Sequence, residues 1–133
     1  MFLLDTNVLS AIRKRDPEAS GWLSRIERGT SWISVVSLGE IAKGVAMKQR
    51  RDPMAADHLN RWLFKVHQTY RDRTFDIDDQ IALEWGRIDA MRTRGVPDGL
   101  IAATAIVHNF TLVTRNVADF ADIGVPIVNP WDL

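Results

Sequence analysis

The chain of 133 residues contains no cysteine. This absence excludes a disulfide framework, a thiolate nucleophile and a cysteine-ligated zinc site. Long hydrophobic runs are missing too, because the apolar stretches fall far short of the ~20 residues that span a bilayer. The N-terminus reads Met-Phe-Leu-Leu-Asp, with no basic segment ahead of its apolar residues, so no signal peptide is expected. These absences predict a cytoplasmic protein with no membrane contact.

The chain has no excess of charge of either sign, since 17 Lys and Arg residues balance 17 Asp and Glu residues. This balance excludes a strongly basic protein that wraps nucleic acid, but it is compatible with an enzyme that acts on RNA or DNA. Hydrophobic residues make up 46 % and charged residues 26 % of the chain, as in ordinary globular proteins. With no low-complexity tract or linker, residues 1–133 are expected to form one domain.

Short apolar runs alternate with helical periodicity along the chain. Strands are predicted where the runs are brief, at 2–4, 32–35, 74–77, 111–113 and 127–128. Among the helices predicted between them, one begins at Ser37, and another begins at Asp98 and is apolar on nearly every side. Strands that alternate with helices favour right-handed crossovers and a mainly parallel sheet. The predicted fold class is therefore α/β, a three-layer α/β/α sandwich around a short central sheet.

Acidic residues follow the predicted strands. Asp5 comes directly after the first strand, and Glu40 lies in the first turn of the helix after the second. Asp98 opens the apolar helix before the fourth strand, and Asn116 and Asp119 follow that strand. In open parallel sheets, ligands bind beyond the carboxyl ends of the strands. We therefore expect the four acids to meet at one edge of the sheet.

Each of these residues also has a purely structural interpretation. Asp5 and Asp98 are favoured helix N-caps, and Ser37–Glu40 has the pattern of a capping box. Asn116 can form an Asx-turn, and Asp119 can begin a helical turn. Caps contribute only ~1 kcal/mol each and have no reason to gather at one edge, whereas a metal site requires that its ligands do. The joint pattern therefore favours a functional site.

The chemistry of this site follows from its ligands. Several carboxylates in one cleft repel each other and hold protons unless a cation neutralises them. Because the expected ligands are all oxygen atoms, the predicted ion is Mg²⁺ or Mn²⁺ and not zinc. His58, His67 and His108 have no ligand spacing. The sequence also lacks a Gly-x-Ser-x-Gly elbow, a phosphate-binding Gly-rich loop and a dinucleotide fingerprint.

Four ordered motifs cover the length of the chain: Leu4–Leu9, Ser34–Gly44, Asp98–Ala105 and Thr114–Phe120. Together they resemble the PIN-domain ribonucleases, most closely the VapC toxins and FitB-like proteins of bacterial toxin–antitoxin pairs. The resemblance implies an endoribonuclease that uses Mg²⁺ or Mn²⁺ to activate the water that hydrolyses RNA. It also implies a homodimer or larger assembly, inhibited by a VapB- or FitA-like antitoxin that connects it to operator DNA.

The resemblance also implies roles for individual residues. The family's first three acidic positions carry over to Asp5, Glu40 and Asp98, and Asp119 is assigned as the fourth catalytic and metal-binding acid. Some members have an aspartate where this chain has Asn116, which is therefore expected to be a neutral or supporting ligand. Three further polar residues are expected to support the site: Thr6, Asn7 and Thr114. Contacts to the RNA backbone are expected from Lys48, Arg50, Arg51 and Arg115.

Three other functions compete with this interpretation. Haloacid-dehalogenase-like phosphatases also place an aspartate after the first strand, but they need a second one where this chain has Asn7. A phosphoacceptor signalling domain needs an acidic cluster there and a lysine after its last strand, and no lysine follows Lys65. The third alternative is a FitB-like protein with little or no catalysis, which regulates transcription in a complex with a DNA-binding antitoxin.

Overall fold

Five short strands form the centre of the fold, and every neighbouring pair is parallel. The structure is a computed structural model that describes residues 1–133. The strands stand in the order β3-β2-β1-β4-β5. Their bounds are β1 (Phe2–Leu4), β2 (Ser31–Ser34), β3 (Thr74–Phe75), β4 (Thr111–Val113) and β5 (Ile127–Val128). The predicted α/β class is confirmed, and the mainly parallel sheet of the prediction is parallel throughout.

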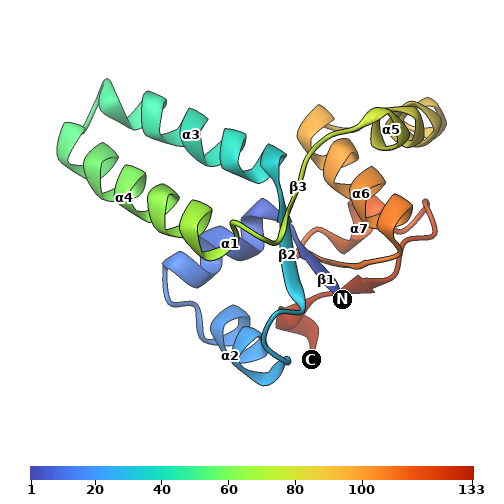
Figure 1. Ribbon diagram of the computed structural model, residues 1–133, viewed down its shortest axis with the longest axis horizontal. Helices are drawn as coiled ribbons and strands as arrows, with labels where there is room; N and C mark the ends of the chain where they lie inside the picture. Colours follow the sequence, from blue (N-terminus) through green and yellow to red (C-terminus); the bar gives the residue numbers. More distant parts are fainter.

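Helices connect the strands and cover the sheet. They are α1 (Thr6–Arg13), α2 (Pro17–Arg25), α3 (Val35–Gln49), α4 (Pro53–Thr69), α5 (Asp79–Met91), α6 (Val96–His108) and α7 (Val117–Phe120), with a 3₁₀ turn at Pro130–Asp132. Figure 1 shows α3 and α4 as a hairpin that extends away from the sheet, with α5 and α6 packed together on the opposite side. None of these helices combines the length and the apolar character that crossing a bilayer requires.

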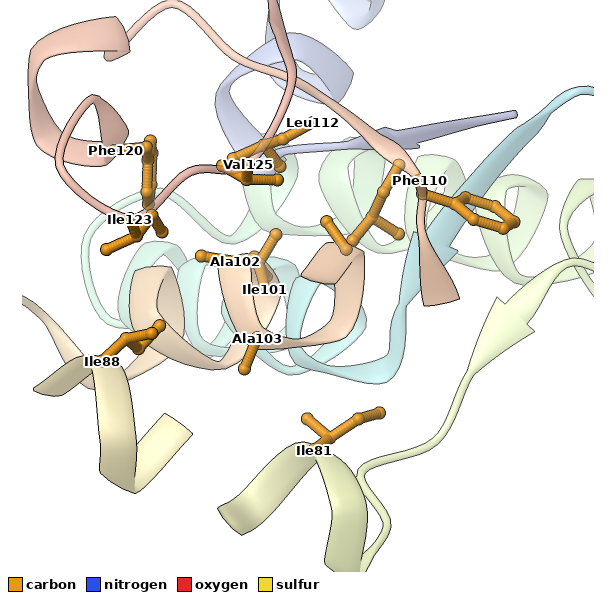
Figure 2. Close-up of a cluster of buried hydrophobic side chains, with 12 residues drawn as sticks. Ile81, Ile88, Ile101, Ala102, Ala103, Phe110, Leu112, Phe120, Ile123 and Val125 are labelled. Carbon is orange, nitrogen blue, oxygen red and sulfur yellow. The ribbon is translucent and has the colours of Figure 1, made fainter. Parts of the chain in front are cut away.

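The hydrophobic core is divided in two by the sheet. Leu3 and Leu112 belong to a cluster with α5 and α6, part of which is drawn in Figure 2. Leu4 and Val113, their neighbours in sequence, belong to a second cluster with α1, α2 and α4. Successive side chains of a strand point to opposite faces, so strands buried on both faces are continuously apolar. The three-layer arrangement therefore follows from adjacent apolar residues in β1 and β4.

Helix α3 begins earlier than the sequence predicted. Its N-cap is Ser34, whose Oγ accepts a hydrogen bond from the backbone N–H of Val36 at 3.0 Å. Ser37 is consequently the third helical residue and is fully buried, and Glu40 lies in the second turn. The structural interpretation of Ser37 and Glu40 as a capping box is therefore wrong. Local sequence could not decide this, because both serines are good N-caps and only packing against the sheet selects one of them.

Helix α6 also begins before its predicted start. The N-cap is Gly95, the helix begins at Val96, and a proline follows in its first turn. Asp98 lies in the first turn and does not cap the helix, so its structural interpretation as an N-cap is wrong. A carboxylate in the first turn is still stabilised by the partial positive charge of the helix N-terminus. The fold thus places Asp98 at the end of α6 that faces the other acids.

Candidate active site

Asp5 is the most deeply buried acid of the site, with 2 % of its surface exposed. It lies between β1 and α1, and its Oδ1 accepts a hydrogen bond from the backbone N–H of Thr6 at 2.7 Å. Its Oδ2 accepts one from Oγ1 of Thr114 at 2.8 Å and a longer one from Nδ2 of Asn7 at 3.3 Å. Because β1 and β4 are neighbours in the sheet, the residues that follow them meet here.

Asn7 and Thr114 also hold the loop that follows β4. Thr114 Oγ1 accepts a hydrogen bond from the backbone N–H of Asn116 at 3.0 Å. Asn7 Oδ1 accepts one from the backbone N–H of Arg115 at 3.4 Å. The Asn116 side chain makes no capping hydrogen bond to α7 and is exposed to solvent. The structure therefore brings the predicted supporting residues to Asp5, with Asn116 connected through its backbone.

Glu40 accepts a hydrogen bond from the hydroxyl of Thr6, which is in turn bonded to the hydroxyl of Ser37. Thr6 Oγ1 donates to Glu40 Oε1 at 2.6 Å and lies 2.8 Å from Ser37 Oγ. Since the single hydroxyl proton of Thr6 goes to Glu40, the Ser37 hydroxyl donates to Thr6. Ser37 was not predicted to support the site. The signal in the sequence was its position three residues before Glu40, which puts both on one face of a helix.

The backbone of and after α7, which carries Asp119, is held by two arginines from the segment between α5 and α6. Arg92 Nη2 donates to the backbone carbonyl of Asp119 at 2.8 Å. Both Arg92 and the buried Arg94 form ion pairs with Asp122, at 3.3 Å and 3.0 Å. These three residues were not predicted from the sequence, because no local pattern relates positions about 30 apart to each other. They fix the backbone on which the exposed Asp119 side chain sits.

The electrostatics of the site couple all four acids. The pKa of Asp5 is raised to about 6, chiefly by burial and also by the charges of Asp98 and Glu40, which together outweigh the lowering effect of the hydrogen bonds from Thr114 and Thr6. Burial likewise raises the pKa of Asp98, with contributions from the charges of Glu40 and Asp119 and no compensating hydrogen bond. Mutual repulsion of this kind shows that the four carboxylates share one region of the sheet edge.

The donor set fits a hard divalent cation. Every candidate ligand is an oxygen atom, and burial together with neighbouring carboxylates raises the pKa values of Asp5 and Asp98. As the side chains stand, no three acidic residues converge closely enough to share one ion. Binding therefore requires carboxylates to rotate. Asp98 is able to do so because no hydrogen bond restrains it.

The predicted RNA-contacting residues divide into two groups. Arg115 lies beside Asn7, and its guanidinium is 4.5 Å from the ring centroid of Trp131. The other three, Lys48, Arg50 and Arg51, lie at the far tip of the α3–α4 hairpin (Figure 1). At 1.5 Å per residue, Lys48 is about 12 Å along the helix axis from Glu40. Only Arg115 is brought to the acids.

Comparison with known proteins decides the family, because residues 2–126 match the PIN domain. The chain belongs to the PIN domain family. Among its relatives, VapC ribonuclease Y4jK of Sinorhizobium fredii is 29 % identical over 99 % of both chains. Toxin FitB of Neisseria gonorrhoeae is 28 % identical over 98 % of this chain and 99 % of its own. The solved structure of FitAcB from Neisseria gonorrhoeae superposes on this PIN domain with a TM-score of 0.89, at 28 % identity and full coverage of both chains.

These matches confirm the predicted resemblance to VapC and FitB proteins. They extend over nearly the whole PIN domain and nearly the whole of the relatives, so the fold is of the same size in each. The short parallel sheet between layers of helices agrees with the predicted fold class.

Proposed function

We propose that this PIN domain is a cytoplasmic, metal-dependent endoribonuclease that acts as the toxin of a toxin–antitoxin pair. The observation that carries the proposal is the buried Asp5 carboxylate, whose pKa is raised to about 6 beside three other acids and which forms no ion pair. A buried acid that served stability alone would be neutralised by a cationic partner. The names VapC ribonuclease and Toxin FitB of the two relatives support the same conclusion.

Four acids would hold Mg²⁺ or Mn²⁺: Asp5, Glu40, Asp98 and Asp119. When bound, such an ion lowers the pKa of a water molecule and stabilises negative charge on phosphate oxygens. The hydroxyl of Thr114 and the amide of Asn7 hold one Asp5 oxygen in a fixed direction, at 2.8 Å and 3.3 Å. A ligand fixed in this way costs less free energy to order when the substrate arrives.

Glu40 has the geometry of a residue that orients the attacking water. Its Oε1 accepts the Thr6 hydroxyl proton at 2.6 Å, and the Ser37 hydroxyl supports Thr6 in turn. One oxygen is thus restrained while the other stays available to accept a proton from water. In-line attack at phosphorus with departure of the 3′-oxygen would leave 5′-phosphate and 3′-hydroxyl ends on the RNA.

An antitoxin partner is proposed together with the catalytic function. Helices α1, α2 and α4 enclose an apolar groove of about 260 Å³, which is suited to a hydrophobic segment of a second chain. Its apolar lining is formed by Leu9, Ile12, Leu23, Trp62, Val66 and Tyr70. Among similar structures, FitAB was solved bound to a DNA fragment, so we propose that operator DNA is reached through the antitoxin.

A homodimer is the proposed assembly of the toxin itself. Helix α5 and the first residue of α6 leave large apolar side chains in solvent: Leu83 is 76 % exposed, Met91 54 % and Val96 53 %. Burying such a surface in a subunit interface is favourable at roughly 25 cal/mol per Å² of apolar area. Size-exclusion chromatography with light scattering tests this part of the proposal, which a monomeric protein at micromolar concentration would contradict.

The catalytic proposal is tested by cleavage of total RNA with mapping of the cut sites. We expect activity with Mg²⁺ or Mn²⁺, no activity in excess EDTA, and recovery when the ion is restored. Full activity in excess chelator would rule out the mechanism. The FitB–DNA similarity supports a second candidate, a non-catalytic partner of a DNA-binding antitoxin. That candidate predicts no RNA cleavage under any metal condition, together with tight operator binding by the toxin–antitoxin complex.

A further inference from the structure

The largest cavity of the protein, about 550 Å³, opens beside the acidic site. It lies between the end of α1, the start of α2 and the loop after β4, and we call it the basic cleft. Its lining contains three cationic side chains, one from the β4–α7 loop and two from the α1–α2 connection. The lining residues are Asn7, Ser10, Ala11, Lys14, Arg15, Asp16, Pro17 and Arg115.

The cations of the basic cleft are not neutralised within the protein. Lys14, Arg15 and Arg115 form none of the five ion pairs of the structure. The one acid in the lining, Asp16, is already engaged, because its Oδ1 accepts the Ala19 N–H at 3.0 Å and its Oδ2 accepts the Trp131 Nε1–H at 3.3 Å. Asp16 keeps its negative charge, so the lining holds three cations against one anion and offers a net positive charge to a ligand.

A role in ending helix α1 explains only one of the three cations in the basic cleft. Lys14 is the C-cap residue of α1, where a cation suits the helix dipole. Arg115 has no such role, because it comes from a loop about 100 residues later in the chain. Its guanidinium lies over the Trp131 ring, which limits its freedom and directs it at the cleft wall. Two distant segments thus bring positive charge to one cavity.

A single side chain separates the basic cleft from the candidate active site. Asn7 lines the cleft, its Nδ2 donates to Asp5 Oδ2 at 3.3 Å, and its Oδ1 accepts the Arg115 backbone N–H at 3.4 Å. An RNA strand with its scissile phosphate at Asp5 carries further phosphates on both sides. The cationic groups of the cleft are placed to contact one of them.

We propose that the basic cleft binds an intact backbone phosphate of the RNA substrate, next to the phosphate that is cleaved. This proposal rests on the ribonuclease function proposed above and assigns a second anion-binding position to it. Arg115 supplies a planar guanidinium that can contact two phosphate oxygens, and Lys14 and Arg15 add charge from the opposite wall. Since the bound phosphate does not react, the cleft contributes binding affinity and not acceleration of the chemical step.

The test compares two triple variants that remove the same charge. The cleft variant is Lys14→Gln, Arg15→Asn and Arg115→Gln. Asn is chosen at position 15 because Arg15 has a φ of 59°, a left-handed conformation that Asn tolerates better than most residues. The comparison variant changes the hairpin tip: Lys48→Gln, Arg50→Gln and Arg51→Gln. Melting temperatures check that both fold, and the single exposed substitution Lys14→Gln replaces the triple if it does not.

Binding of a single-stranded RNA oligonucleotide is measured by fluorescence anisotropy in EDTA over a range of NaCl concentrations. Kinetic constants are then measured with Mg²⁺ or Mn²⁺. For the cleft variant, we expect Kd to rise roughly tenfold at low salt, as for loss of one charge-assisted contact. The slope of log Kd against log salt should fall by about 0.7, the value for one phosphate of a single strand. KM should rise with kcat unchanged, and the tip variant should change KM less.

Equal losses in the two variants would overturn the proposal, because overall charge and not the cleft would then bind RNA. An unchanged Kd or salt slope in the cleft variant would overturn it too. So would a cleft variant that binds RNA normally but loses the antitoxin, since the cleft would then recognise an acidic protein segment. Wild-type protein that binds RNA through the cleft without cleaving it would refute only the proposed catalysis, so the two failures are distinguishable.

Discussion

Replacing Asp5 with Asn is expected to change the pH dependence of the stability of the metal-free protein. Burial of the carboxylate raises its pKa from 3.8 to about 6, so the folded protein holds this proton more tightly than the unfolded chain does. The stabilisation from the bound proton is therefore fully present below pH 3.8. It is lost as the pH rises to about 6, and it stays lost above that pH.

The size of this effect follows from the two pKa values. The difference between about 6 and 3.8 is about 2.2 units, which corresponds to roughly 3 kcal/mol at 1.36 kcal/mol per unit. Solvent screening removes little of this, because Asp5 is only 2 % exposed. Asn cannot ionise, so the free energy of unfolding of the variant lacks the decrease that ionisation of Asp5 causes in the wild-type protein at neutral pH.

Urea unfolding in EDTA between pH 4 and pH 8 measures the effect as the difference between the two proteins. The variant should gain about 2 kcal/mol on the wild type between pH 4 and pH 7, somewhat less than the full effect because the unfolded chain is already partly deprotonated at pH 4. Altered hydrogen bonds to Thr114 and Asn7 shift this difference by the same amount at every pH. Asp16 and Asp122, whose pKa values are lowered, affect both proteins alike. A difference that stays constant from pH 4 to pH 7 would refute the reasoning.

Three further substitutions probe the other acids and a hydroxyl. Glu40→Gln should abolish RNA cleavage while the melting temperature barely falls, since Gln still accepts the Thr6 hydroxyl proton; a fully active variant would remove Glu40 from the mechanism. Asp98→Asn should abolish RNA cleavage and growth arrest, and continued growth arrest would contradict a role of Asp98 in catalysis. The substitution should also slightly raise the stability of the metal-free protein at pH 7, because it removes a carboxylate of raised pKa. Thr114→Val should lower the free energy of unfolding by about 1–3 kcal/mol, because it leaves the buried Oδ2 of Asp5 without its shortest hydrogen bond. It should also weaken metal binding measured by calorimetry, and an unchanged metal affinity would contradict this role.

The sequence by itself determined the architecture and the candidate acids. Adjacent apolar residues in Phe2–Leu4 and Thr111–Val113 specify strands buried on both faces, and such strands require a helical layer on each side. The placement of Asp5 directly after β1 followed from the same pattern, because a polar residue at the end of a buried strand has to lie at the sheet edge. These features could be predicted from the sequence because each depends on residues that are close together in the chain.

Where the local sequence allowed two alternatives, only the tertiary structure decided between them. Ser34 and Ser37 are equally good N-caps in isolation, and the fold uses Ser34 because Ser37 is needed in a buried contact with Thr6. The candidate phosphate position was likewise invisible in the sequence, where Lys14 and Arg115 are a hundred residues apart. The β1–β4 pairing brings the segments that carry them to one cavity, because strands distant in the chain become neighbours in a parallel sheet.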